Sequence, residues 1–267
     1  MQVGDLGNGR RRLDLGQALI IAACGLPRGW IGAWGAIAAA VAVWAARPAV
    51  PAGPATLFWA VPAIVVLAVL VGALARVSIS RNLEGARRLG LGPGGLQLAW
   101  PEARLVGAVI LCLIFWLMVA SVLALVVLAV AGLSELDSAA IQARNWAAVG
   151  PWWKLATLAI IGLGALYILT VVTVRLTLWA PATLGRGHMV SLNSMGIAQG
   201  SFWPLLAGLV LTAIPTGLLV ALGAAGALKG WEGEVFGLIG LFGVQAPLTL
   251  AFLGRAYLEL EYWVPEA

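Results

Sequence analysis

The sequence has few charged side chains, a single histidine and only two cysteines. Charged residues make up 10% of the 267 residues, against about 25% in soluble domains. This excludes an ordinary soluble fold, which covers most of its surface with polar groups. Cys24 and Cys112 lie far apart in apolar surroundings without CxxC spacing, so neither a disulfide nor a zinc site is predicted.

Groups that could form an active site are equally scarce. The sequence contains no Walker loop, no HExxH helix and no paired acidic residues within an apolar run. His188 lies between glycines in a loop, where a solvated side chain is a simpler interpretation than a general base. We therefore predict that the chain is not an enzyme and uses no cofactor and no metal.

Apolar residues are abundant: 62% of the chain is hydrophobic and the mean hydropathy is +0.99. About 20 helical residues cross a hydrocarbon core of roughly 30 Å. On this basis the sequence predicts an all-α, polytopic membrane protein with six transmembrane helices arranged as three hairpins, plus short interfacial helices. The whole chain, residues 1–267, is expected to form a single integral membrane domain, with spans near 29–46, 56–80, 103–132, 153–180, 203–228 and 235–258.

The connections between the spans have their own signals. The stretch "RPAVPAGPAT" predicts a turn between the first two spans, because proline lacks the amide proton that a continuing helix needs. A short surface helix is expected after Ser134, between spans three and four. The apolar run 18–25 follows a basic stretch and resembles a signal peptide, but we favour an interfacial helix that stays in the mature protein.

The distribution of cationic residues predicts the orientation. Lysine and arginine near the ends of spans are retained in the cytoplasm during insertion. With both termini cytoplasmic, eleven cationic residues lie on the cytoplasmic side and four on the opposite side, with Arg28 ambiguous. An even number of spans agrees with this orientation.

Arginines at the cytoplasmic ends of the spans have two interpretations. They are either interfacial anchors whose long side chains reach the phosphates, or they converge on a cytoplasmic vestibule that binds lipid headgroups or another anion. The candidate lipid- or anion-binding residues are Arg76, Arg81, Arg87, Arg88, Arg175, Arg186 and Arg255.

The remaining polar and small residues predict local features. Spacing of four residues predicts helical ion pairs between Arg255 and Glu259 and between Glu84 and Arg88. In the sixth span, a polar kink is predicted at Gln245 and Pro247. Three glycines of the same span are expected to serve close helix packing: Gly237, Gly240 and Gly243.

Two stretches carry a family resemblance. "VRLTLWAPATLGRGHMVSLNSMGIAQGSFWPLL" and "LGPGGLQLAWPEARLVGA" resemble the loops of six-helix bacterial inner-membrane proteins, namely the YciC family and the membrane domain linked to glycerophosphoryl diester phosphodiesterases. The resemblance covers about residues 76–211. It implies the six-helix fold and a multi-pass protein of the bacterial inner (cytoplasmic) membrane, and it carries over no catalytic residue.

These observations predict a non-enzymatic accessory or scaffold protein. Its partners would be membrane lipids with anionic headgroups and other membrane proteins or further copies of the chain. Nucleic acid is not expected as a partner, because the basic residues flank apolar segments. The alternative is a small-solute or lipid transporter that has no intramembrane ion-coupling residue.

Overall fold

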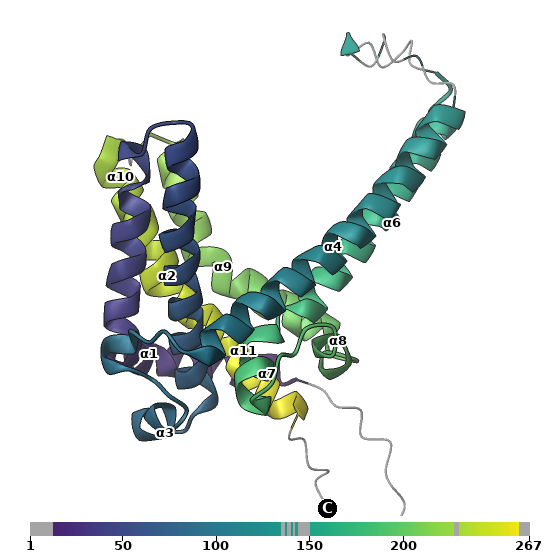
Figure 1. Ribbon diagram of the computed structural model, residues 1–267. Coiled ribbons are helices and arrows are strands. Elements are labelled where there is room, and N and C mark those ends of the chain that lie inside the picture. Colours follow the sequence, from purple (N-terminus) through teal and green to yellow (C-terminus); the bar gives the residue numbers. More distant parts are fainter. Residues whose placement is uncertain are drawn as a thin grey trace, which may run out of the picture. The chain divides into compact units, whose positions relative to one another are not determined.

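The computed structural model describes residues 13–134, 137, 140, 142–143, 150–226 and 230–261, and within these ranges it is helical, with no strand. Figure 1 labels the helices along the chain. The α-helices are α1 Leu15–Ala45, α2 Pro54–Ile79, α3 Leu83–Arg88, α4 Trp100–Leu133, α6 Trp152–Leu176, α7 Trp179–Arg186, α8 Ser194–Ile197, α9 Phe202–Ala224, α10 Gly230–Ile239 and α11 Ala246–Glu261. Shorter turns are η1 Arg47–Ala49, η2 Pro93–Gly95 and the π-helical η3 Gly240–Gln245.

Six helical stretches of the described residues are long and apolar enough to cross a membrane, which confirms the predicted number. Three of them begin at least five residues earlier than predicted, among them the third, which includes the η2 turn from Pro93. The first begins at Leu15 because the apolar run 18–25 continues directly into the predicted span. The sixth begins at Gly230 and passes through α10, η3 and α11. The predicted surface helix after Ser134 falls largely outside the described residues, as do the arginines at 10–12.

The chain divides into two compact units, Met1–Val109 with Arg175–Ala267, and Ile110–Val174. In the second unit, two hydrogen bonds join the two ends of α6 to the middle of α4 and to the residue that follows α4. The indole of Trp116 donates to the Thr173 hydroxyl at 3.0 Å, and the Lys154 ammonium donates to the Ser134 carbonyl at 2.8 Å. The apolar side chains of these two helices are mostly exposed, as expected for helices that face lipid. The single membrane domain stays a prediction.

The core of the first unit lies where α1, α2 and the η3–α11 segment meet. Fully buried alanines of α1 pack against larger side chains of α2, which lets the two helices approach closely. The buried members of this cluster are Ala33, Ala36, Ala40, Val69, Leu70, Ala73, Leu74, Ala86, Leu91 and Phe242. In Figure 1, α1 and α2 stand side by side.

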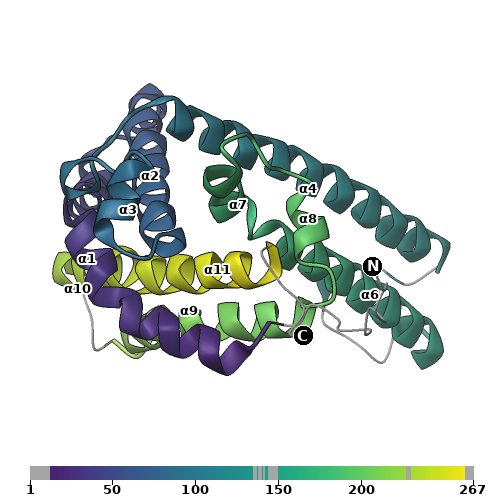
Figure 2. The same cartoon turned by 90° about the horizontal axis from the view of Figure 1, so that it is seen from below.

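Helix α1 bends at Ala33, whose backbone angles (φ −127°, ψ 17°) are not helical. Figure 2 shows the two parts of α1 running in different directions. The η2 turn packs directly on this bend. A Cβ on Gly95 would lie 2.8 Å from the Ala33 Cα, and Gly95 also has a φ of +78°, so glycine is required there. The "GPGG" turn therefore fits against the bend of α1 only because Gly95 has no side chain.

The glycines predicted to pack in the sixth span behave differently from one another. A Cβ on Gly240 would collide with the Leu219 side chain of α9, so close packing is confirmed at this position. A Cβ on Gly237 would meet no atom within 4 Å, and one on Gly243 would meet only Ile239 of the preceding turn. The close-packing prediction is wrong for Gly237 and Gly243, because each of them lines a pocket where the neighbouring helix does not come close enough to require glycine.

Candidate functional site

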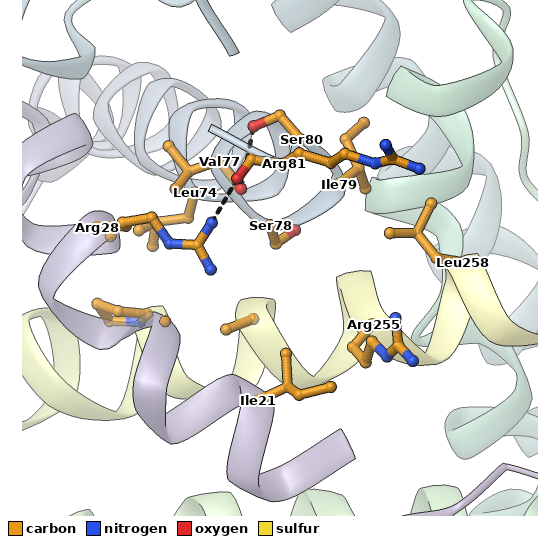
Figure 3. A pocket seen from close by; sticks show the side chains of 14 residues that line it. Ile21, Arg28, Leu74, Val77, Ser78, Ile79, Ser80, Arg81, Arg255 and Leu258 are labelled. Atoms are coloured by element: carbon orange, nitrogen blue, oxygen red, sulfur yellow. Dashed lines mark hydrogen bonds between the residues drawn. The ribbon is translucent and has the colours of Figure 1, made fainter. Parts of the chain in front are cut away.

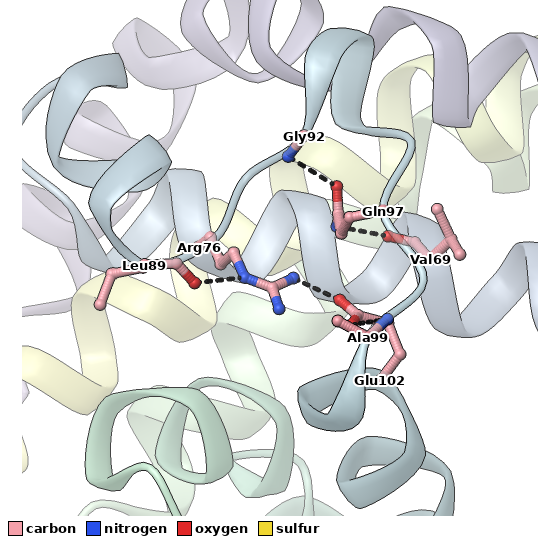
Figure 4. A network of polar contacts seen from close by, with 7 residues as sticks. All are labelled: Val69, Arg76, Leu89, Gly92, Gln97, Ala99 and Glu102. Carbon is pink, nitrogen blue, oxygen red and sulfur yellow. Dashed lines mark hydrogen bonds and ion pairs between the residues drawn. The ribbon is translucent and has the colours of Figure 1, made fainter.

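Arg76, near the end of α2, is 1% exposed and belongs to a buried polar network (Figure 4). Its Nη1 donates to Glu102 Oε1 at 2.6 Å, and its Nε donates to the Leu89 carbonyl at 2.9 Å. Glu102 is also 1% exposed, and its other oxygen accepts from the Ala99 amide at 3.0 Å, at the start of α4. The pair therefore joins α2 to the first turn of α4, and the Arg76 guanidinium is enclosed by protein.

Gln97 extends the network toward α2. Its amide nitrogen donates to the Val69 carbonyl at 3.4 Å, and its oxygen accepts from the Gly92 amide at 3.3 Å. The bond from Gly92 satisfies a backbone amide of the loop that connects α3 to α4, and the bond to Val69 ties this loop to α2. Sequence reasoning missed Glu102 as a partner for Arg76. The available signal was an acidic residue in the first turn of an apolar helix, which alone predicts only a favourable helix dipole interaction.

Three further arginines of the candidate set form ion pairs with glutamates. Arg88 bonds Glu84 at 2.6 Å and Arg255 bonds Glu259 at 2.7 Å, which confirms both predicted helical pairs. Arg186, at the end of α7, donates from Nε and Nη2 to one oxygen of Glu261, at 2.9 and 2.6 Å. This third pair connects residues 75 positions apart, and spacing in the sequence could not reveal it.

The other members of the candidate set differ in exposure. Arg81 and Arg87 are exposed. Arg175, in the last turn of α6, is half-buried, and its Nε has no hydrogen-bond partner within the described parts of the chain. His188 is exposed, with its Nδ1 3.1 Å from the Arg186 carbonyl oxygen. Within the described ranges, no group of three His, Cys, Asp or Glu side chains is placed to hold a metal ion.

Two of the predicted arginines meet at a pocket of about 260 Å³, and a third arginine joins them there. The pocket lies between the first part of α1, the end of α2 and the middle of α11. Figure 3 shows the Arg28 guanidinium beside the Arg81 backbone carbonyl on one side of it, and the side chains of Arg81 and Arg255 extending on the other side. Ser78 and Ser80 also line it, and apolar side chains form the rest of its wall: Ile21, Leu74, Val77, Ile79, Pro247, Ala251 and Leu258. We call this the arginine pocket.

Local structure explains how the arginines reach the pocket. Helix α2 ends at Ile79, and Ser80 is extended (φ −98°, ψ 148°), so the chain turns outward at Arg81. Arg28 Nη1 donates to the Arg81 carbonyl at 2.7 Å, which holds α1 against this turn. Helix α11 can approach α2 closely because Gly254 has no side chain. A Cβ at this position would collide with the Ser78 side chain, so only glycine fits at this crossing.

Gln245 and Pro247, the predicted polar kink, lie at a change of helix type. The π-helical turn η3 ends at Gln245, and Pro247 follows in α11 and lines the arginine pocket. Pro247 has no amide proton for the Gly243 carbonyl, and the Trp30 indole donates to that oxygen instead at 2.6 Å. The Gln245 side-chain oxygen is buried without a hydrogen-bond partner within the described ranges.

The sequence identified Arg81 and Arg255 as candidates but left Arg28 ambiguous. Its position between Pro27 and Gly29 gave no direction for its side chain, which the hydrogen bond to the Arg81 carbonyl holds against the end of α2. No protein-family model, curated protein or solved structure matches this chain. The resemblance to the YciC family and the phosphodiesterase-linked membrane domain therefore stays a prediction.

Proposed function

We propose that this chain is a non-enzymatic accessory or scaffold protein of a bacterial inner membrane that binds anionic phospholipid headgroups in the arginine pocket. In this proposal the six spans form three hairpins and both termini lie in the cytoplasm. The single supporting observation is the pocket itself, which is lined by three arginines and two serines and otherwise by apolar residues and glycines. A phospholipid presents the matching combination of a phosphate next to acyl chains.

The position of the pocket agrees with the predicted topology. It lies at the end of α2 and along α11, the ends that the cationic residues assign to the cytoplasm. Arginine suits the role because its planar guanidinium donates two parallel hydrogen bonds to phosphate oxygens. Each arginine near an anionic surface contributes about 1 kcal/mol. The three together therefore favour an anionic headgroup over a neutral one by roughly two orders of magnitude.

Lipid binding is tested by removing two guanidiniums of the pocket. The Arg28→Gln/Arg81→Gln variant is expected to bind phosphatidylglycerol about 20- to 30-fold more weakly in native mass spectrometry of the purified chain. Arg47→Gln is the matched control, because Arg47 is also exposed but lies at the other end of α1, in η1. Equal lipid retention by both variants would refute the proposed site.

The scaffold part of the proposal needs a separate measurement. Affinity purification of the full chain from mild detergent, followed by mass spectrometry, should recover a fixed stoichiometric partner or a homo-oligomer. A monomer that carries only lipid would contradict the scaffold role and leave the lipid site standing.

A small-solute or lipid transporter is the second candidate, and one observation favours it. Helices α9 and α11 share an internal polar contact in which Thr249 donates to the fully buried Thr212 at 3.1 Å. The unpaired oxygen of Gln245 lies one turn earlier in the same segment. Flux in proteoliposomes that is lost in Thr212→Val/Gln245→Leu would support a path through these groups, and no flux would leave the scaffold proposal in place.

A further inference from the structure

The charges around the arginine pocket are unequal, and their balance points to a particular class of phosphate. Among the residues that the structure describes, Arg28, Arg81 and Arg255 line the pocket, and no carboxylate does. Glu259 neutralises part of this charge from behind Arg255, at 2.7 Å. Three cations and one anion leave a net charge of +2.

We infer that the arginine pocket selects a phosphate monoester, as in phosphatidic acid, over a phosphodiester such as phosphatidylglycerol. This inference rests on the proposed function and narrows its ligand. A monoester carries a charge of about −1.5 to −2 near pH 7, whereas a diester carries −1. The monoester therefore neutralises the pocket, and the diester leaves one positive charge without a counter-charge.

The donor groups of the pocket fit the same ligand. The hydroxyls of Ser78 and Ser80 donate to the carbonyls of Ala75 and Val77, at 2.8 and 3.2 Å. The guanidiniums are thus the main donors to a bound anion. Each guanidinium has five N–H groups, and a hydrogen bond within the protein occupies only one of them. A terminal phosphate has three equivalent oxygens and a diester has two, so three guanidiniums are better matched by the monoester.

The size of the pocket also favours a small terminal group. Its volume of about 260 Å³ lies below the usual range of roughly 300–1,000 Å³ for ligand sites. A monoester enters end-on, with its glycerol and chains toward the apolar residues Ile21, Leu74 and Leu258. A diester carries a further substituent on the phosphorus, which needs additional room in this small pocket.

Binding should depend on pH through the ligand. A phosphate monoester loses its second proton near pH 6. The charged groups that face it are Arg28 from α1, Arg81 after α2, and Arg255 with Glu259 from α11. Guanidiniums stay protonated throughout pH 5.5–8. The monoester thus gains charge with rising pH beside an unchanged cationic pocket, and its affinity should rise about five- to tenfold.

The experiment compares water-soluble dihexanoyl phosphatidic acid, dihexanoyl phosphatidylglycerol and inorganic phosphate on the purified full chain at pH 5.5 and 8. Binding is measured by thermophoresis. We expect the monoester lipid to bind more tightly than the diester and only the monoester to tighten with pH. Arg81→Gln should remove most of this difference in affinity. The substitution keeps the backbone carbonyl that accepts the hydrogen bond from Arg28. Arg47→Gln, an exposed arginine outside the pocket, is the matched control.

Each other outcome overturns a distinct statement. Equal affinity for both lipids at both pH values would refute the monoester preference and leave the proposed lipid site intact. Failure of both lipids to bind would refute the two together. Inorganic phosphate binding as tightly as the monoester lipid would support the monoester chemistry but identify a soluble ligand, and this would overturn the lipid as its source.

Discussion

Replacing Glu102 by alanine leaves the Arg76 guanidinium buried beside the Leu89 carbonyl without its carboxylate. Both side chains of the pair are 1% exposed, so water cannot take the place of the lost partner. Arginine cannot shed its proton to avoid the penalty. Breaking a buried ion pair from one side costs about 3–5 kcal/mol. Alanine also loses the acceptor for the Ala99 amide at the start of α4, which adds about 1 kcal/mol.

This loss corresponds to a large change in thermal stability. At roughly 2–4 °C per kcal/mol for a chain of this size, the total loss of about 4–6 kcal/mol in Glu102→Ala should lower the midpoint of unfolding in detergent by about 8–24 °C. Glu102→Gln should be milder, because its amide oxygen can still accept a hydrogen bond from Arg76. The double variant Arg76→Met/Glu102→Met should recover most of the stability, since neither charge then remains buried.

The exposed pair Glu84–Arg88 provides the control. Its side chains are 69% and 78% exposed, and pairs of this kind contribute about 0.3–0.5 kcal/mol. Glu84→Ala should therefore move the midpoint by no more than about 2 °C. If Glu102→Ala and Glu84→Ala had the same small effect, or if the double variant were no more stable than Glu102→Ala, the reasoning from burial would be refuted.

Three further predictions concern single positions. Gly208→Leu should strongly destabilise the first unit, because the new side chain would collide with a buried phenyl ring of α11. Gly217→Leu on the same helix meets open space and should be nearly neutral in the same melting assay. Trp30→Phe should cost about 1 kcal/mol of stability by removing the hydrogen bond from the indole to the Gly243 carbonyl. This cost should shrink in the Pro247→Ala background, where a backbone amide can donate to the same carbonyl. Equal costs in both backgrounds would exclude the indole as a substitute for the missing proline amide. A cysteine at Ser80 should react with a membrane-impermeant maleimide only after the cytoplasmic side is exposed, and labelling in intact cells would reverse the proposed orientation.

The sequence alone determined the features that depend on neighbouring residues. The number of helices that can cross a membrane follows from the length and composition of each apolar run. The ion pairs Arg255–Glu259 and Glu84–Arg88 follow from the spacing of four residues, which places both side chains on one face of a helix whatever surrounds it. The turn at "RPAVPAGPAT" follows from proline in the same local way, since α1 ends at Ala45 and α2 begins at Pro54.

The tertiary structure decided which distant groups meet. Arg76 pairs with Glu102, 26 residues away, and Arg28 joins Arg81, 53 residues away. Such contacts depend on how far each helix is rotated about its axis and where helices cross, and small residues such as Gly240 and Gly254 set those crossings through packing. The amino-acid composition does not distinguish an arginine that is buried against a carboxylate from one that lines a pocket. Only the packing of α1, α2 and α11 separates the structural Arg76 from the pocket residues Arg81 and Arg255.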